Sequence, residues 1–375
     1  MHNPVGIYHH VFIRHRLNPC MKGAEIGFST CYYATVGNTK HADFDSTFGA
    51  MEMKYSRFLI LITGLAYLNS CSTASADEPT QHTVRSAVAK SLPYIAERGQ
   101  WWMDKKKCVS CHRGAFTIWA HAAAAEAGID VDQGQLTAWV DWSFEAMLKK
   151  NDKDVIVTTQ NLNGVAQMLF ATRTLALTET QTLQRNQLLP LLQAGQQGDG
   201  SWKPAGQLPS QKRPLPETTY VTTAWNHWMG GAAGLSDAVS TKALTFLKSD
   251  RDVVSTESLV VQLVEDSDTA QTQLALHSIL NEQNDDGGWG WIRERESDAM
   301  ATGQVLYALS MRSREGEATK AIELARMYLL TTQTSDGSWE VKGTKKNKQD
   351  KIQETATYWG TCWAVIGLLE SEKVR

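Results

Sequence analysis

Two cysteines and a histidine stand close together at residues 108–112, which read Cys-Val-Ser-Cys-His. Two thiols at this spacing lie on one turn and reach the two vinyl groups of a haem, with which they form thioethers. The imidazole that follows is positioned to bind the iron as its proximal axial ligand. The motif therefore predicts one covalently attached haem c, held by Cys108 and Cys111, with His112 as the proximal iron ligand.

Two other kinds of site use a CxxC pair, and both fit this chain less well. A structural zinc site needs four ligands, and the chain has no second CxxC pair. A thioredoxin-type redox motif belongs between a strand and a helix, whereas the sequence around residue 108 has a helical pattern throughout.

The sixth iron ligand is left open by the sequence. Candidates are the methionines and histidines near the motif or within reach through tertiary contacts, namely Met103, His121, Met168, His227 and Met300. Each of these residue types is more often a packed core residue or a hydrogen-bonded side chain than an iron ligand. An iron with an open sixth position is the alternative.

The residues beside the motif allow two interpretations each. Trp101, Trp102 and Trp119 either wall the haem or belong to ordinary helix packing. The basic run 105–107 either meets the haem propionates and a redox partner or is a solvated charged run.

The N-terminal 76 residues contain an export signal. Met53–Arg57 is basic, Phe58–Leu68 is apolar, and Ala74–Ala76 has small residues that fit a cleavage site. We therefore expect residues 53–76 to be a signal peptide and residues 1–52 to be a leader from a mis-assigned start codon, with a genuine long leader as the alternative. An exported, periplasmic location agrees with haem attachment, which takes place outside the bacterial cytoplasm.

A cysteine near the end of the signal offers a second processing route. Leu68-Asn69-Ser70-Cys71 is similar to a bacterial lipoprotein box, although Asn69 is atypical. If this site is used, Cys71 carries lipid and the protein is tethered to a membrane. A net charge of −3 gives no electrostatic basis for nucleic-acid binding.

The rest of the chain, residues 77–375, is helical in pattern and repetitive. Three copies of one motif, Gln-x-x-x-Gly-x-Trp, end at Trp202, Trp289 and Trp339, and their spacing indicates units of about 45–50 residues, each a helical hairpin. The predicted first helices of the pairs cover 82–97, 134–149, 180–194, 238–249, 269–282 and 317–332. The predicted second helices, richer in small and aromatic residues, cover 114–127, 160–176, 217–233, 254–264, 297–311 and 354–370.

These repeats resemble the QW motifs of squalene–hopene cyclases. The resemblance implies an all-α fold, an α6/α6 toroid of six helical hairpins that terpene cyclases share with prenyltransferase β-subunits. The second helices would then form an inner ring and the first helices an outer ring. The haem motif follows the first outer helix, after a connection at 99–107, where a QW turn would stand.

The resemblance does not extend to catalysis. Cyclases of this family protonate their substrate with the middle Asp of DxDDTA, but the nearest string here is 265–270, where Ser267 stands in that place. A prenyltransferase-type zinc set is also missing, since Cys362, His227 and His277 are too few and scattered. Neither activity is expected.

Three hypotheses follow. The first is an exported c-type haem protein that transfers electrons to a redox partner, with the toroid as scaffold. The second is a haem-dependent enzyme or sensor that binds a lipid or terpenoid in the toroid cavity. The third is a haem-free binding or structural toroid.

Overall fold

The computed structural model describes residues 78–108, 113–205, 215–249, 253–265, 270–312, 315–343 and 350–373. They all belong to one compact unit, Ser72–Arg375. The leader, the signal segment and Cys71 lie outside the described residues, and so do Cys111 and His112.

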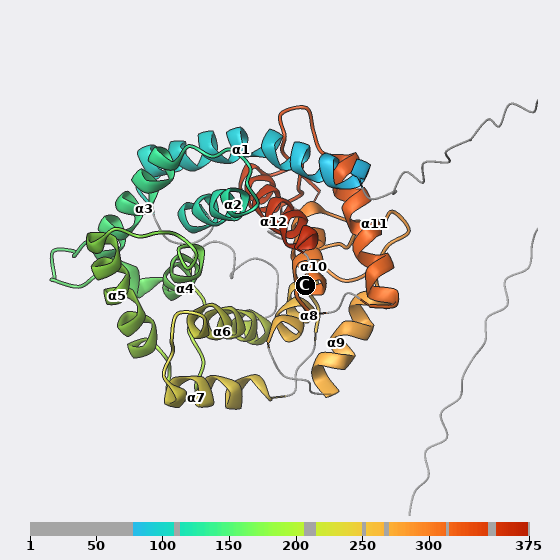
Figure 1. Ribbon diagram of the computed structural model, residues 1–375. Helices are drawn as coiled ribbons and strands as arrows, with labels where there is room; N and C mark the ends of the chain where they lie inside the picture. The colour runs from blue at the N-terminus through green and yellow to red at the C-terminus, as the bar shows by residue number, and fades with distance from the viewer. Residues whose placement is uncertain are drawn as a thin grey trace, which may run out of the picture. The chain divides into compact units, whose positions relative to one another are not determined.

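The described residues form an α/α toroid of twelve α-helices, which confirms the predicted fold (Figure 1). The outer helices are α1 (Glu78–Lys106), α3 (Gln133–Leu148), α5 (Glu179–Ala194), α7 (Asp237–Leu247), α9 (Ala270–Asn281) and α11 (Glu317–Thr332). The inner helices are α2 (Gly114–Glu126), α4 (Leu162–Ala171), α6 (Leu215–Gly231), α8 (Thr256–Val264), α10 (Ala299–Arg312) and α12 (Glu354–Glu372). A short 3-10 turn, η1 (Val157–Gln160), precedes α4.

The two rings differ in burial because only the inner helices are covered on all sides. Every residue of α8 is buried, whereas α7 buries only Ala243 and Leu247. Inner helices also approach one another closely at glycines: a Cβ on Gly303 of α10 would lie 2.5 Å from the Trp363 carbonyl carbon of α12. Small residues on the inner helices thus allow the tight ring that the sequence predicted.

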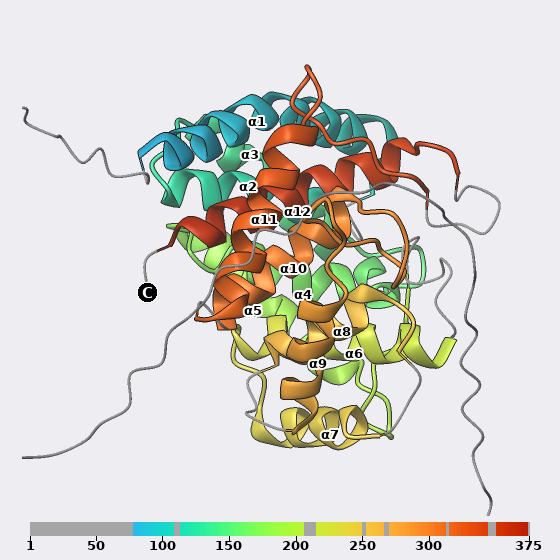
Figure 2. The same cartoon turned by 90° about the vertical axis from the view of Figure 1, so that its right-hand side faces the viewer.

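Each inner helix contacts the next around the ring, and α12 contacts α2. The outer helix α1 contacts both α11 and α12, so the start of the described chain packs against its end. Figure 2 shows α1 along the edge of the ring above α2 and α12. The ring is therefore closed by contacts between residues far apart in the sequence.

The tryptophans of the three QW turns are buried and bind the helix that precedes them. The indole Nε1 atoms of Trp202, Trp289 and Trp339 donate to the carbonyls of Leu192, Ile279 and Leu329, at 2.8, 2.8 and 2.7 Å. Each indole thus satisfies a carbonyl in the last turn of an outer helix, which has no intrahelical partner.

The glutamines of the same turns bind the next outer helix along the ring. The Gln196 and Gln283 amides donate to Val239 O and Ala321 O, both at 2.9 Å. Gln333 donates to Ala87 O of α1 at 2.9 Å. The third QW turn therefore connects the last outer helix to the first and closes the outer ring.

One helix is longer than predicted. The first outer helix was expected to end at 97 and to be followed by a connection at 99–107, but α1 continues to Lys106. Gly99 does not end the helix. It lies where α1 approaches α2 closely, and a Cβ at this position would lie 2.5 Å from Thr117 Oγ1. The glycine therefore marks close helix packing and not a turn.

None of the described helices is long and apolar enough to span a membrane.

Candidate functional site

The haem motif lies on the connection from α1 to α2, which is the kind of outer-to-inner connection that carries the QW turns elsewhere. Lys107 ends α1 with a left-handed backbone (φ 49°), and Cys108 follows it, half-buried. Arg113, at the other end of the motif, is the N-cap residue of α2. The two described ends of the motif therefore adjoin an outer helix and the inner helix that follows it.

Apolar side chains surround these two ends. Met103, one turn before Cys108 on α1, is 2% exposed, and Trp102 is half-buried. Phe116 in the first turn of α2 is buried, with its ring centroid 5.9 Å from that of Trp359 and 5.3 Å from that of Trp363. Trp101 points outward, 42% exposed.

Arg113 is a buried cation at this site. The residue is 1% exposed, and its guanidinium carbon lies 3.9 Å from the Tyr358 ring centroid and 4.9 Å from that of Trp102. Its Nη2 forms an ion pair with Glu354, whose side chain is 48% exposed. Its Nε and Nη1 are buried and have no hydrogen-bond partner among the described residues.

The groups behind Arg113 are neutral. Burial raises the pKa of Tyr358 well above its usual value, and the Tyr358 hydroxyl bonds Thr117 Oγ1 at 2.6 Å. Burial likewise raises the pKa of Cys362 to about 12, which makes this thiol unreactive. Neither residue supplies a negative charge to Arg113 at neutral pH.

The candidate sixth ligands are spread along the ring. The inner helices run parallel, as the close approach of Gly360 to Met300 and of Gly367 to Gly303 shows for α12 and α10. Met300 and Met103 therefore lie toward the motif's end of the ring. Met168 is fully buried near the end of α4, two residues before Phe170, whose ring lies 4.9 Å from that of Trp119 of α2.

The two candidate histidines are hydrogen-bonded within the fold. His121 Nδ1 bonds Thr117 O at 2.8 Å, its ring contacts Trp139 of α3, and burial lowers its pKa. His227 Nδ1 lies 2.9 and 3.0 Å from the two carboxylate oxygens of Glu265. Both imidazoles are therefore held by groups of the fold itself.

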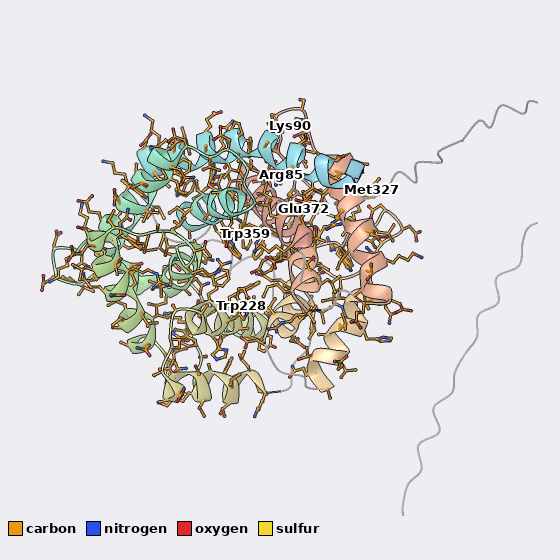
Figure 3. The ribbon with its side chains drawn as sticks, viewed as in Figure 1. Arg85, Lys90, Trp228, Met327, Trp359 and Glu372 are labelled. Carbon is orange, nitrogen blue, oxygen red and sulfur yellow. The ribbon has the colours of Figure 1, made fainter. Side chains whose placement is uncertain are left out.

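Aromatic rings meet in the middle of the inner ring, which sequence reasoning did not foresee. Trp225 of α6 lies 5.6 Å from Trp363 of α12, and Trp119 of α2 lies 5.6 Å from Tyr307 of α10, both between centroids. Figure 3 shows Trp228 and Trp359 inside the ring of helices. Aromatic pairs three or four residues apart on the inner helices were the signal for this cluster.

Two buried acids were also missed. Glu257, on inner helix α8, accepts from Trp225 Nε1 at 2.8 Å, so a carboxylate does contact the central aromatic cluster. Glu217 of α6 accepts from the Ser255 backbone N–H at 2.9 Å and hydroxyl at 2.6 Å. A Glu within the apolar stretch 256–264 was the available signal for the first.

A cavity of about 450 Å³ lies beside the α9–α10 and α11–α12 connections, with Asp298 and Lys342 in its lining. Burial raises the pKa of Asp298 to about 6, although its carboxylate accepts from the backbone N–H groups of Trp291 and Ala301. In the described part of the chain, no cluster of three or more His, Cys, Asp or Glu residues could hold a metal ion.

No protein-family model and no curated protein matches the chain. Among solved structures, it is similar to a variant of the type II terpene cyclase MstE from Scytonema in complex with geranylgeranyl dihydroxybenzoate. The TM-score is 0.51 at 12% identity, over 78% of this chain and 99% of that chain. Another MstE variant, in complex with merosterolic acid A, has a TM-score of 0.51 at 11% identity, over 78% of this chain and 98% of that one.

The chain is also similar to the unsaturated glucuronyl hydrolase of Bacillus sp. GL1, with a TM-score of 0.52 at 11% identity, over 78% of this chain and 97% of that chain. Two proteins with unrelated chemistry thus share its architecture, and a fold does not specify an activity. The comparisons show that this chain has the α/α toroid fold.

Proposed function

We propose that the protein is an exported c-type haem protein that transfers electrons, with the toroid as the scaffold for one haem. Cys108 and Cys111 would attach the haem through thioethers, and His112 would bind the iron. When bound, the haem supplies a one-electron couple between ferric and ferrous iron. Met103 or Met300, which lie toward the same end of the ring, would be the sixth ligand.

The observation that carries this proposal is the Cys-Val-Ser-Cys-His sequence at the turn from α1 to α2. The residues around the turn fit a haem in two respects. Met103, Trp102 and Phe116 offer apolar cover, and Arg113 has buried N–H groups without partners among the described residues, which suits a cofactor with carboxylates. The export signal supports attachment outside the cytoplasm.

The chain's own residues have two further tasks in electron transfer. The apolar side chains would exclude water and thereby reduce the reorganisation of solvent that accompanies a change in the charge of the iron. Lys105, Lys106 and Lys107 are exposed beside the motif, so they form a positive patch that would guide an acidic redox partner.

We favour electron transfer over a lipid- or terpenoid-binding enzyme or sensor. The described rings of Trp119, Trp225, Tyr307 and Trp363 pack against one another in the middle of the toroid, where such a ligand would bind. Binding there requires these rings to move apart, whereas electron transfer at the α1–α2 turn does not.

The test is to express the chain from Met53 with a cytochrome c maturation system and to purify it from the periplasmic fraction. We expect one covalent haem by intact mass and a pyridine haemochrome spectrum of the c type. A six-coordinate, low-spin spectrum that does not respond to CO supports electron transfer, while CO binding supports the enzyme or sensor.

The control variant is Cys108→Ala combined with Cys111→Ala, which should fold without covalent haem because no thiol remains at the motif. A wild-type protein without haem contradicts the proposal and leaves the haem-free toroid. Cys71→Ser, compared by membrane fractionation, separates a lipid-tethered protein from one cleaved after Ala76.

A further inference from the structure

Arg113 carries a charge that its surroundings only partly compensate. It is 1% exposed, and burial of a guanidinium is costly unless its hydrogen-bond donors are all paired. The rings of Trp102 and Tyr358 cover its faces, which leaves the hydrogen-bonding edges of the guanidinium in the plane between them. The partners of Arg113 must therefore approach along these edges.

Only one edge has a partner among the described residues. Nη2 donates to Glu354, while Nε and Nη1 are buried without a hydrogen bond. Arg98 and Arg312 each leave only their Nε buried without a hydrogen bond among the described residues, and Arg293 donates to Glu282 through both Nε and Nη2. A buried donor left without an acceptor is destabilising, so these N–H groups are expected to have an acceptor that the described residues do not provide.

The helix that Arg113 begins is also uncompensated. Among its described residues, α2 has no capping side-chain bond at its N-terminus and no acidic residue in its first turn. The N-terminus of a helix favours a negative group because its backbone N–H groups and dipole are positive. Two independent features, the orphaned guanidinium edges and this helix end, therefore favour an anion at the same place.

We infer that Arg113 binds a propionate of the haem attached at residues 108–112. This inference rests on the proposed function, since the propionates are the carboxylates that the cofactor would bring. Arginine is suited to the role because its charge is permanent and its planar donors match a carboxylate. Arg113 directly follows His112, the predicted proximal ligand, in the sequence. Glu354, whose side chain is 48% exposed, then neutralises the part of the Arg113 charge that the propionate leaves.

The experiment compares Arg113→Gln with the wild-type haem protein, after intact mass has shown that both carry haem. Loss of the positive charge beside the haem favours the ferric form. We expect a shift of about tenfold in the ferric–ferrous equilibrium, which is a midpoint potential lower by ~59 mV for a one-electron couple. The propionate bending band in the resonance Raman spectrum should shift in the same variant, because this band responds to hydrogen bonding at the carboxylate.

Two variants separate binding from a general effect of charge or folding. Arg113→Lys keeps the charge but not the planar donors, so it should shift the Raman band while leaving the potential near that of wild type. It also tests the inference if Arg113→Gln does not fold. Arg173→Gln is the matched control, because Arg173 is likewise stacked on aromatic rings, those of Phe170 and Trp119, but it follows α4 and its Nη1 donates to the Phe170 carbonyl at 2.8 Å. It should change neither readout.

The outcomes are distinct. Wild-type protein without covalent haem overturns the proposed function itself. Haem-bearing Arg113 variants with an unchanged propionate band overturn the inference alone and show that Arg113 serves only the turn through Glu354.

Discussion

At the scale of single residues, the direction of an aspartate's pKa shift follows from its burial and from the hydrogen bonds that its carboxylate accepts. Asp298 is fully buried, and desolvation raises its pKa to about 6 although backbone N–H donors, among them those of Trp291 and Ala301, act in the opposite direction. Asp336 is exposed in a QW turn, and the hydroxyls of Thr334 and Ser338 lower its pKa. The same residue type thus contributes opposite pH dependences at two sites.

Asp298 should therefore make the protein less stable as pH rises from about 4 to 7. Its folded pKa of about 6 lies above the usual value of 3.8, so the native state binds more protons than the unfolded state in this range. The contribution is fully present below pH 3.8 and is lost as pH rises through 6. The difference between a pKa of about 6 and one of 3.8 corresponds to ~3 kcal/mol in the free energy of unfolding.

Urea unfolding of wild type and Asp298→Asn across this pH range measures the difference. The variant should lack the slope, because asparagine does not titrate. Asp336→Asn is the control, since the window of Asp336 lies below its unfolded pKa and the variant should keep the wild-type slope. An equal slope in wild type and Asp298→Asn would mean that Asp298 is not desolvated.

At the scale of elements, each QW turn joins the outer helix before it to the next outer helix around the ring. The turn glycines make this possible: Gly200, Gly287 and Gly337 have φ of 91°, 87° and 85°. The neighbouring helix packs directly on the turn, so a Cβ on Gly337 would lie 2.2 Å from Lys90 O of α1. The Lys90 ammonium also donates to Thr334 O of this turn at 2.9 Å.

Gly337→Ala should therefore loosen α1 from the ring. The positive φ alone costs about 1–3 kcal/mol for a residue with a side chain, and the contact with Lys90 O adds to it. Hydrogen exchange should show faster exchange of α1 amides in the variant, with a lower melting temperature.

Gly198→Ala is the matched control, because Gly198 lies in the first QW turn with no atom within 4 Å of its Cβ position. It should leave both measurements close to wild type. Equal stability of the two variants would show that the third turn does not hold α1.

At the scale of the whole ring, the centre is an aromatic core to which the inner helices contribute from several sides. Trp363 of α12 contacts rings from three other inner helices, namely those of Phe116, Trp119, Trp225 and Tyr307. Such rings bury large apolar surfaces and prefer the tilted and edge-on arrangements seen here. Packing across the axis therefore stabilises the closed ring as a unit.

Trp363→Ala should destabilise the protein by about 3–5 kcal/mol, the usual cost of removing a buried tryptophan. Denaturant unfolding followed by circular dichroism measures this loss. Trp101→Ala, which removes a tryptophan that is 42% exposed, should change stability by less than ~1 kcal/mol. A loss below that for Trp363→Ala would show that the ring does not depend on its centre.

The sequence by itself determined the helices and their pairing, because helical periodicity and the Gln–Gly–Trp spacing are local features of the chain, and the toroid followed from the resemblance of these repeats to QW motifs. It also located the haem motif between the first two helices. Only the tertiary structure decided three other features. These are the continuation of α1 past Gly99, the central aromatic contacts and the burial of Glu257, because each depends on packing between residues that are distant in the sequence. The surroundings of Arg113 belong to this second group, since Trp102, Tyr358 and Glu354 reach it only when α12 closes the ring against α1 and α2.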